Sequence, residues 1–230
     1  MTDRPILFSA PMVRALLAGT KTQTRRVLKP RPMSHVHDFL AVGWDKKSGK
    51  ALWETRHDGK PTFGISLGDG LLDSHVATIA VGDRLWVKET WRTTPAYDDL
   101  KPSDMGGDEP LNYLADDSYF NWAEADGARH GKTRVSIFMP RWASRLTLTV
   151  TDVRVERLQD ISEADAIAEG VEPAALTDHW KDYGPDPMPW ASPVESYRSL
   201  WDSINGAGAW AANPFVVAVS FDVREGNIDA

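Results

Sequence analysis

The sequence predicts an α+β protein built on a small mixed β-barrel with helices on its flank. Strand and helix patterns follow one another without a regular β-α-β repeat, which argues against a doubly wound parallel sheet. Several segments alternate apolar and polar side chains, as half-buried strands do. The chain has 230 residues, which is ample for a real core and suits one long domain with insertions.

Composition excludes several classes of protein and site. The chain has no cysteine, so it forms no disulfide, thiolate metal site or cysteine nucleophile. No apolar run approaches a membrane span and the first residues lack a signal-peptide core, so we expect a cytoplasmic protein without a membrane partner. The net charge of −7 opposes nonspecific binding to long duplex nucleic acid. A local basic pocket can still capture one nucleotide.

The first elements lead into a basic turn. Residues 5–8 are typical of a short buried strand, and Ser9 is a candidate N-cap. Apolar residues then recur at helical spacing through residues 12–18. Gly19 fits the position that ends such a helix. A strand is expected at residues 25–28, where two following prolines stop it.

The turn after Gly19 gathers positive charge, because no acid lies between Arg4 and Asp38. The cations of this stretch are Arg4, Arg14, Lys21, Arg25, Arg26, Lys29 and Arg31. Lys21 and the Thr24 hydroxyl stand three residues apart. Such a field suits a phosphate, a nucleotide or a developing oxyanion. The alternative is an ordinary solvated basic edge strand.

Residues 31–80 are predicted to be an irregular insertion, rich in Gly, Pro, His and Asp. Residues 64–68 match the G-x-S-x-G pattern, but no helix can start well after them, which disfavours an esterase. His35, His37 and Asp38 offer metal ligands in a polar loop. Without a further ligand in view, we expect no metal there.

The strand predicted at residues 81–91 ends near a carboxylate. Leu85 and Val87 alternate with charged residues. Glu89 is either a solvated edge carboxylate or a pocket residue facing Lys21. Aromatic residues such as Trp86 and Trp91 are candidates to stack on a base.

Residues 93–135 are predicted to be a second insertion, acidic and punctuated by Gly and Pro. The simplest interpretation is a mobile, solvated loop. Four aromatic residues indicate that part of it docks on the body of the protein: Tyr113, Tyr119, Phe120 and Trp122.

The C-terminal half adds strands at residues 145–155 and 214–223. Arg141 and Arg145 flank the first of these strands. They either reach a substrate phosphate or lie on the surface.

Two helices lie between these strands. Ser162 opens one with a capping-box pattern and Gly170 ends it. Glu169 therefore lies on the last turn, where a carboxylate opposes the helix dipole. Glu169 is either a pointer to function or a solvent-facing residue. Ser192, followed by proline, opens the second helix.

The basic turn, Gly19-Thr20-Lys21-Thr22-Gln23-Thr24-Arg25-Arg26, resembles the G-x-K-x-x-T/E-x-R signature of the ASCH family. The resemblance covers Ile6–Leu28, Val81–Trp91, Leu146–Gly170 and Trp201–Val223, and the long form looks like ASCH proteins of phages and prophages. It implies a single PUA-like domain over residues 1–230, a small mixed β-barrel with insertions at about 31–80 and 93–135.

The variant with threonine is similar to the small bacterial N4-acetylcytidine amidohydrolases. The similarity implies that Lys21, Thr24 and Glu169 form a catalytic set that removes an N-acyl group from a modified cytosine, without cofactor or metal. Thr24 would be the nucleophile, and Lys21 the base if its pKa is lowered. Glu169 would orient Lys21 or pass the proton to the leaving amine, although a nearby carboxylate raises a lysine pKa. The candidate substrate-binding residues are Arg25, Arg26, Trp86, Glu89 and Trp91.

Two alternatives remain open at this point. A PUA-like module can bind RNA or a modified base without hydrolysing it, with Lys21 and Arg26 as phosphate contacts. Less favoured is a ribonuclease in which Lys21 assists attack by a ribose 2′-hydroxyl. The expected partner is in each case a modified nucleoside or RNA.

Overall fold

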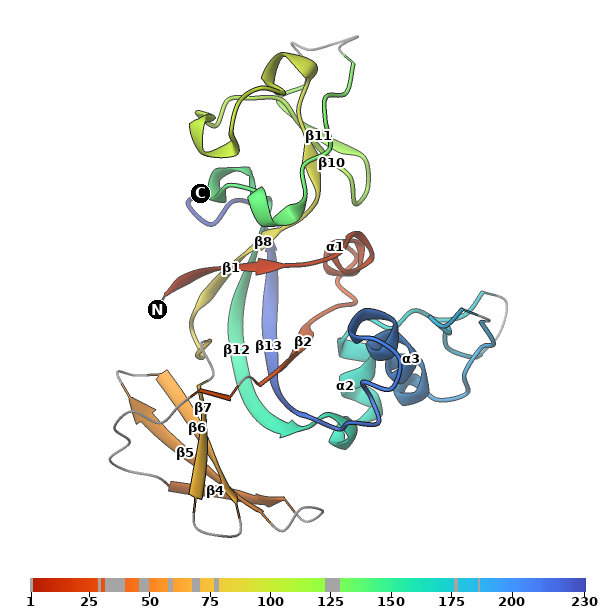
Figure 1. The fold of residues 1–230 in the computed structure, drawn as a ribbon. Coiled ribbons are helices and arrows are strands. Elements are labelled where there is room, and N and C mark those ends of the chain that lie inside the picture. The colour runs from red at the N-terminus through yellow and green to blue at the C-terminus, as the bar shows by residue number, and fades with distance from the viewer. Residues whose placement is uncertain are drawn as a thin grey trace. The chain divides into compact units, whose positions relative to one another are not determined.

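The chain folds as a mixed α+β protein rich in strands, which confirms the predicted class (Figure 1). A computed structural model describes residues 2–28, 30–31, 40–45, 50–57, 60–67, 71–76, 79–122, 129–175, 178–185 and 187–230. The chain forms two compact units. The first comprises Met1–Thr22, Gly82–Val150 and Phe221–Ala230, and the second comprises Gln23–Val81 and Thr151–Ser220.

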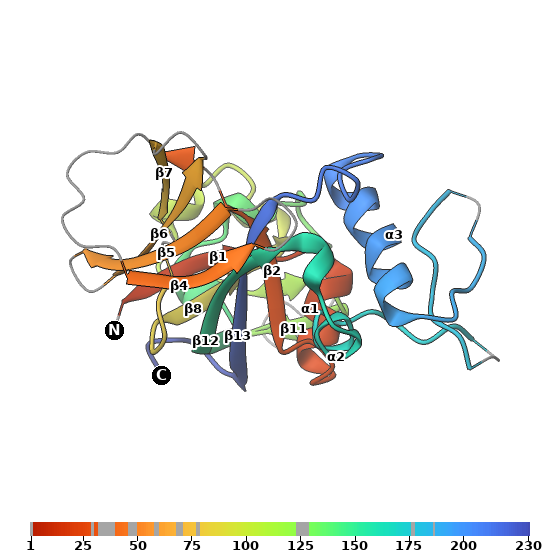
Figure 2. The ribbon, with the colours of Figure 1, turned by 90° about the horizontal axis from the view of Figure 1, so that it is seen from below.

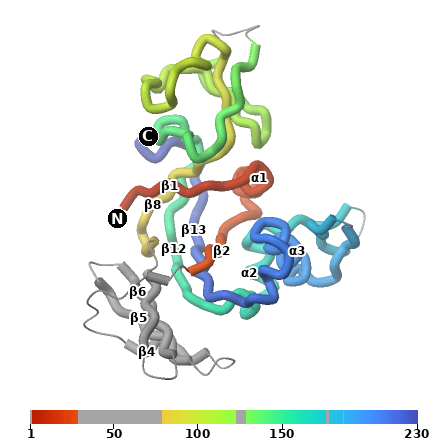
Figure 3. Tube along the Cα trace, viewed as in Figure 1, coloured from red at the N-terminus to blue at the C-terminus, as the bar shows by residue number. Residues whose placement is uncertain are grey.

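One sheet carries the longest strands of both units. Its strands are β1 (Asp3–Leu7), β2 (Gln23–Val27), β8 (Arg84–Lys88), β12 (Leu146–Arg157) and β13 (Phe215–Glu225). In the first unit β1 runs parallel to β8, and β8 runs antiparallel to β12. In the second unit β2 runs antiparallel to β13. Each of β12 and β13 contains residues of both units, and the course of the two strands can be followed in the Cα trace (Figure 3).

The alternation of side chains explains the long strand β12. Leu146, Leu148 and Val150 are buried, whereas Thr149 and Thr151 are exposed; Thr147 departs from the alternation, because it is buried and donates to the Gly226 carbonyl. This pattern confirms the half-buried strand expected there. Among the described residues no strand pairing closes the sheet, and the barrel stays a prediction.

The helices of the described chain are α1 (Ala10–Leu17), α2 (Glu163–Ala168) and α3 (Pro193–Asn205). The predicted caps of the last two are confirmed, because the Ser162 and Ser192 hydroxyls each accept a backbone N–H of the first turn. In the second unit α2 and α3 lie against one another (Figure 2). Their contact closes an apolar cluster that includes Tyr197 and Trp201. None of the described helices is long and apolar enough to cross a membrane.

The segment expected to be a solvated loop, residues 93–135, is ordered over its described part. It contributes two strands to a three-stranded antiparallel sheet formed by β9 (Trp91–Arg92), β10 (Leu111–Tyr113) and β11 (Ser118–Phe120). Leu111 and Tyr113 are buried with Trp91. The docking of Tyr113 is therefore confirmed, while Tyr119 and Phe120 are exposed.

The expectation that residues 31–80 are irregular is wrong for the residues described there. They form an antiparallel sheet of order β3-β7-β6-β5-β4. Its strands are β3 (Pro30–Arg31), β4 (Leu40–Asp45), β5 (Lys50–His57), β6 (Lys60–Leu67) and β7 (Leu71–Val76). Ser66 pairs with Leu72 inside this sheet, so the strand-turn-helix of a nucleophile elbow is absent from the described backbone. His35, His37 and Asp38 lie outside the described residues.

Candidate functional site

The basic turn begins where α1 ends. Gly19 adopts a φ of 70°, which favours glycine, and its N–H bonds the Leu16 carbonyl at 3.0 Å. The Lys21 N–H bonds the Ala15 carbonyl at 3.1 Å. The Lys21 side chain is wholly buried, and its Nζ lies 5.7 Å from the centroid of the Phe8 ring. The alternative of a solvated basic edge is therefore wrong for Lys21.

Strand β2 continues the turn with three buried polar residues in the second unit: Gln23, Thr24 and Arg25. Thr24 lies opposite Val219 of β13, and Arg25 lies opposite Ala218. Arg26 follows them, and the residue as a whole is exposed. Burial of its guanidinium nevertheless lowers the pKa of Arg26, and the nearby Glu169 and Tyr197 oppose this fall. Burying such groups is costly unless they are hydrogen-bonded or paired, so this strand depends on internal partners.

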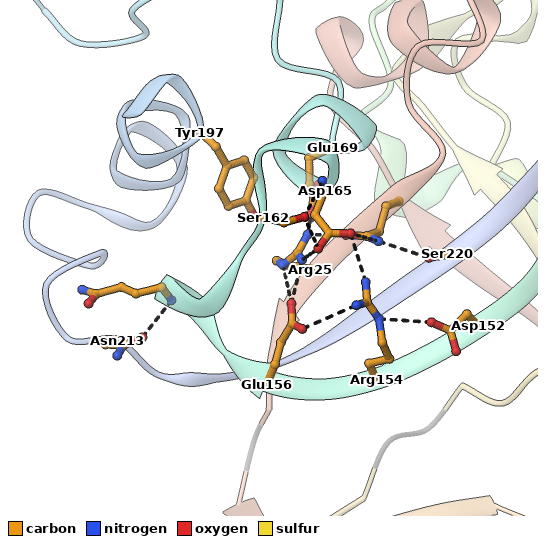
Figure 4. Close-up of polar contacts among 12 residues, drawn as sticks. Arg25, Asp152, Arg154, Glu156, Ser162, Asp165, Glu169, Tyr197, Asn213 and Ser220 are labelled. Atoms are coloured by element: carbon orange, nitrogen blue, oxygen red, sulfur yellow. Dashed lines mark hydrogen bonds and ion pairs between the residues drawn. The ribbon is translucent and has the colours of Figure 1, made fainter. Parts of the chain in front are cut away.

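Arg25 obtains those partners from carboxylates on two elements (Figure 4). Its Nη2 lies 2.6 Å from Glu156 Oε1 and 3.3 Å from Asp165 Oδ2, and its Nη1 lies 3.6 Å from Glu169 Oε1. Gln23 Oε1 accepts a further hydrogen bond from Nη1. The Arg25 side chain has no exposed surface. This geometry suits a residue that positions carboxylates better than one that binds a substrate phosphate.

Glu169 is fixed from a second side by α3. It is the C-cap of α2 and is buried, so a solvent-facing glutamate is excluded. The Tyr197 hydroxyl donates to Glu169 Oε1 at 3.3 Å (Figure 4). Burial, together with the neighbouring Glu169 charge, raises the pKa of Tyr197 well above its usual value of 10.0. Tyr197 therefore stays protonated and remains a donor. A buried, oriented carboxylate of this kind can accept or pass a proton.

Asp165 supports the same network from the first turn of α2. Its Oδ1 accepts hydrogen bonds from Gln23 Nε2 at 2.9 Å and from Arg154 Nη2 at 3.0 Å. Ser162 donates to its other oxygen. Burial favours the neutral acid, but these bonds and the Arg25 charge outweigh it and lower the pKa of Asp165 to about 2.

The first unit holds a separate carboxylate cluster around Glu89. Arg145 donates hydrogen bonds to both carboxylate oxygens of Glu89, from Nε to Oε1 at 2.8 Å and from Nη2 to Oε2 at 2.9 Å. Arg145 also pairs with Asp116 at 2.9 Å and lies 4.2 Å above the centre of the Tyr113 ring. Burial raises the pKa of Glu89, and the bonds from Arg145 oppose this rise. Because Glu89 is only 1% exposed, it is not a solvated edge carboxylate.

The two candidate stacking residues are also in the first unit. Trp91 is wholly buried, with the Arg134 guanidinium 5.4 Å from its ring centroid. Trp86 is also buried, at 9% exposure, and Lys88 Nζ lies 5.2 Å from the centroid of its ring. A base cannot stack on Trp91 in this conformation.

The predicted site residues thus fall in both units. Lys21, Trp86, Glu89 and Trp91 belong to the first unit, and Thr24, Arg25, Arg26 and Glu169 belong to the second. Of these the structure pairs Arg25 with Glu169. The catalytic set of Lys21, Thr24 and Glu169 stays a prediction.

Sequence reasoning missed three parts of these clusters. Glu156 lies one residue beyond the strand predicted at residues 145–155, Tyr197 is predicted only as a residue on one face of a helix, and Arg145 has no predicted partner. No local signal could have found them, because Arg25 and Glu156 are 131 positions apart and Glu89 and Arg145 are 56 apart.

The described residues contain no group of three or more His, Asp or Glu side chains that could hold a metal ion. Comparison of the chain with protein-family models, with curated proteins and with solved structures finds no match.

Proposed function

We propose that the chain is an ASCH-like amidohydrolase that removes an N-acyl group from the exocyclic amine of a modified cytosine, with N4-acetylcytidine as the model substrate. The observation that carries the proposal is the burial of Lys21, which has no exposed surface. A buried lysine is costly as a structural element. Enzymes use such lysines as bases in acyl transfer.

In the proposed reaction the Thr24 hydroxyl attacks the acyl carbonyl while Lys21 accepts its proton. The C–N bond breaks, the cytosine amine leaves with a proton, and the acyl group stays on Thr24 as an ester. Water then hydrolyses the ester, which releases the carboxylate and restores Thr24. Glu169 serves as the proton carrier or as the residue that orients Lys21.

The surroundings of Glu169 support this role. Arg25 and Tyr197 hold its carboxylate from β2 and α3. The positive charge of Arg25 partly offsets the negative charge of Glu169. This reduces the extent to which the carboxylate would raise the pKa of a nearby lysine base. Arg25 is therefore a positioning residue in the proposal, while Arg26, which is exposed, remains the candidate contact for a phosphate.

The test is release of cytidine from N4-acetylcytidine by the purified chain, followed by chromatography. Lys21→Met, Thr24→Val and Glu169→Gln keep side-chain size, and each is expected to lower kcat by about 100-fold or more. Thr22→Val and Glu163→Gln are matched controls, because both residues are exposed neighbours. The controls are expected to retain parental activity.

Absence of turnover by the parent chain on N4-acetylcytidine and a small panel of N4-acyl cytosines would overturn the proposal. Salt-dependent RNA binding without turnover would then favour the non-catalytic module. A shortened RNA product would favour the ribonuclease.

A further inference from the structure

A cavity of about 670 Å³ lies in the first unit, and none of the residues assigned above to the reaction is among those that line it. It is lined by Lys101, Pro102, Ser103, Lys132, Thr133, Arg134, Val135, Phe138 and Pro140. These residues come from two short segments of the 93–135 region and its continuation. The volume is that of a small-molecule site.

The wall of this cavity is mainly apolar. Val135 and Phe138 are 54% and 63% exposed, although large apolar side chains gain free energy from leaving water. Phe138 is presented by the 3₁₀ helix Ser136–Phe138, and Pro102 by the 3₁₀ helix Pro102–Asp104. Clustered apolar groups around a hollow are typical of a surface that binds something.

Arg134 lines the same cavity and is only 7% exposed. Its Nη2 donates to the Tyr97 carbonyl at 2.7 Å, and its Nε has no hydrogen-bond partner. In the described part of the chain no carboxylate forms an ion pair with Arg134. Arg25 and Arg145, in contrast, each form an ion pair with a buried carboxylate, Glu169 and Glu89 respectively.

The charge of Arg134 therefore lacks a counterion. A guanidinium cannot lose its proton in a protein, and a buried charge is normally paired. Lys101 and Lys132 add positive charge to the lining, and none of the lining residues is acidic. A guanidinium matches a carboxylate in shape and can bind it with two hydrogen bonds.

We propose that this cavity binds a small organic carboxylate with an apolar body. Arg134 pairs with the carboxylate, and Val135, Phe138 and Pro140 cover the apolar body. The lysine ammonium groups draw the anion in from solvent. This site is independent of the amidohydrolase reaction.

Calorimetric titration of the full chain with naphthoate tests the proposal, with naphthalenemethanol as a neutral probe of similar shape. Naphthoate is expected to bind with a Kd below about 1 mM, and the neutral probe at least about tenfold more weakly. Absence of naphthoate binding would overturn the proposal, as would equal affinity for the two probes.

Variants locate the binding. Arg134→Met is expected to weaken naphthoate binding by at least about tenfold, whereas Arg129→Met, which removes an exposed arginine outside the lining, leaves it unchanged. Phe138→Ala keeps the test decisive if Arg134→Met fails to fold. Its matched control is Phe120→Ala, which removes a 45% exposed phenylalanine outside the lining. Equal binding by Phe138→Ala and Phe120→Ala would place the ligand elsewhere and overturn the assignment.

Discussion

Each unit of this protein places an arginine among carboxylates, and the two clusters are built differently. Arg145 in the first unit keeps 19% of its side chain exposed and grips one buried carboxylate with two bonds. Arg25 in the second unit has no exposed surface and is shared by three carboxylates, one of which also binds Tyr197. In the first arrangement Arg145 joins the buried Glu89 to Asp116 near the surface, whereas the second arrangement positions Glu169 from several sides.

Replacing each arginine in turn should give the largest difference in stability between the two clusters. Arg25→Met leaves three carboxylates without their shared cation, and we expect a loss of about 3–5 kcal/mol in the free energy of unfolding. Arg145→Met should cost less, about 2 kcal/mol, because water reaches this cluster. Urea denaturation measures both.

The control for these two variants is Arg198→Met on α3, whose ion pair with Glu195 is exposed. It should change stability by no more than about 0.5 kcal/mol. Equal losses for Arg25→Met and Arg145→Met would contradict the distinction between the clusters.

The pH dependence of stability should have opposite signs in the two clusters. The pKa of Asp165 is lowered from 3.8 to about 2. The ionised Asp165 therefore contributes about 2 kcal/mol to the free energy of unfolding above its ordinary pKa of 3.8, and this contribution is lost as the pH falls from about 4 to about 2. The pKa of Glu89 is raised above 4.5, so the native state binds its proton more tightly and stability falls as pH rises past that value.

Asp165→Asn should flatten the unfolding free energy between about pH 4 and pH 2, and Glu89→Gln should remove the decline at higher pH. Denaturant titrations at several pH values measure both effects. The exposed Glu163 serves as control through Glu163→Gln. A parental profile in Asp165→Asn would mean that Asp165 carries no such linkage.

Two buried tyrosines offer a matched test of function. The Tyr197 hydroxyl donates to Glu169, and the Tyr113 hydroxyl donates to the Ala143 carbonyl at 3.0 Å. Replacement of either by Phe should cost about 1 kcal/mol of stability. Only Tyr197→Phe should also lower kcat for N4-acetylcytidine, by about tenfold, because Glu169 loses a donor. An equal loss of kcat in Tyr113→Phe would show that the effect is merely structural.

The smallest expected difference concerns the helix caps. Ser162 accepts the Asp165 N–H at 3.1 Å, whereas Ser9 makes no side-chain capping bond to α1. Ser162→Ala should therefore lower the free energy of unfolding by about 1 kcal/mol, which a thermal melt detects as a lower melting temperature. Ser9→Ala should have little effect. A larger loss of stability in Ser9→Ala than in Ser162→Ala would contradict the assignment of Ser162 as the stronger cap.

The sequence by itself determined the elements whose signals are local. Ser162 and Gly170 marked the ends of α2, Ser192 marked the start of α3, and alternation marked β12, because caps and half-buried faces depend on neighbouring residues. The same reasoning identified Lys21, Thr24 and Glu169 as unusual, although it could not tell burial from exposure.

Only the tertiary structure decided which charges meet. The contacts of Arg25 with Glu156 and of Arg145 with Glu89 join residues far apart in the chain, and no local pattern encodes such pairs. The sheet over residues 31–80 was missed for the same reason, since strand pairing depends on partners more than on intrinsic preference. Burial is the physical reason for these pairs, because an unpaired charge in the interior is costly and is stabilised by a partner of opposite charge.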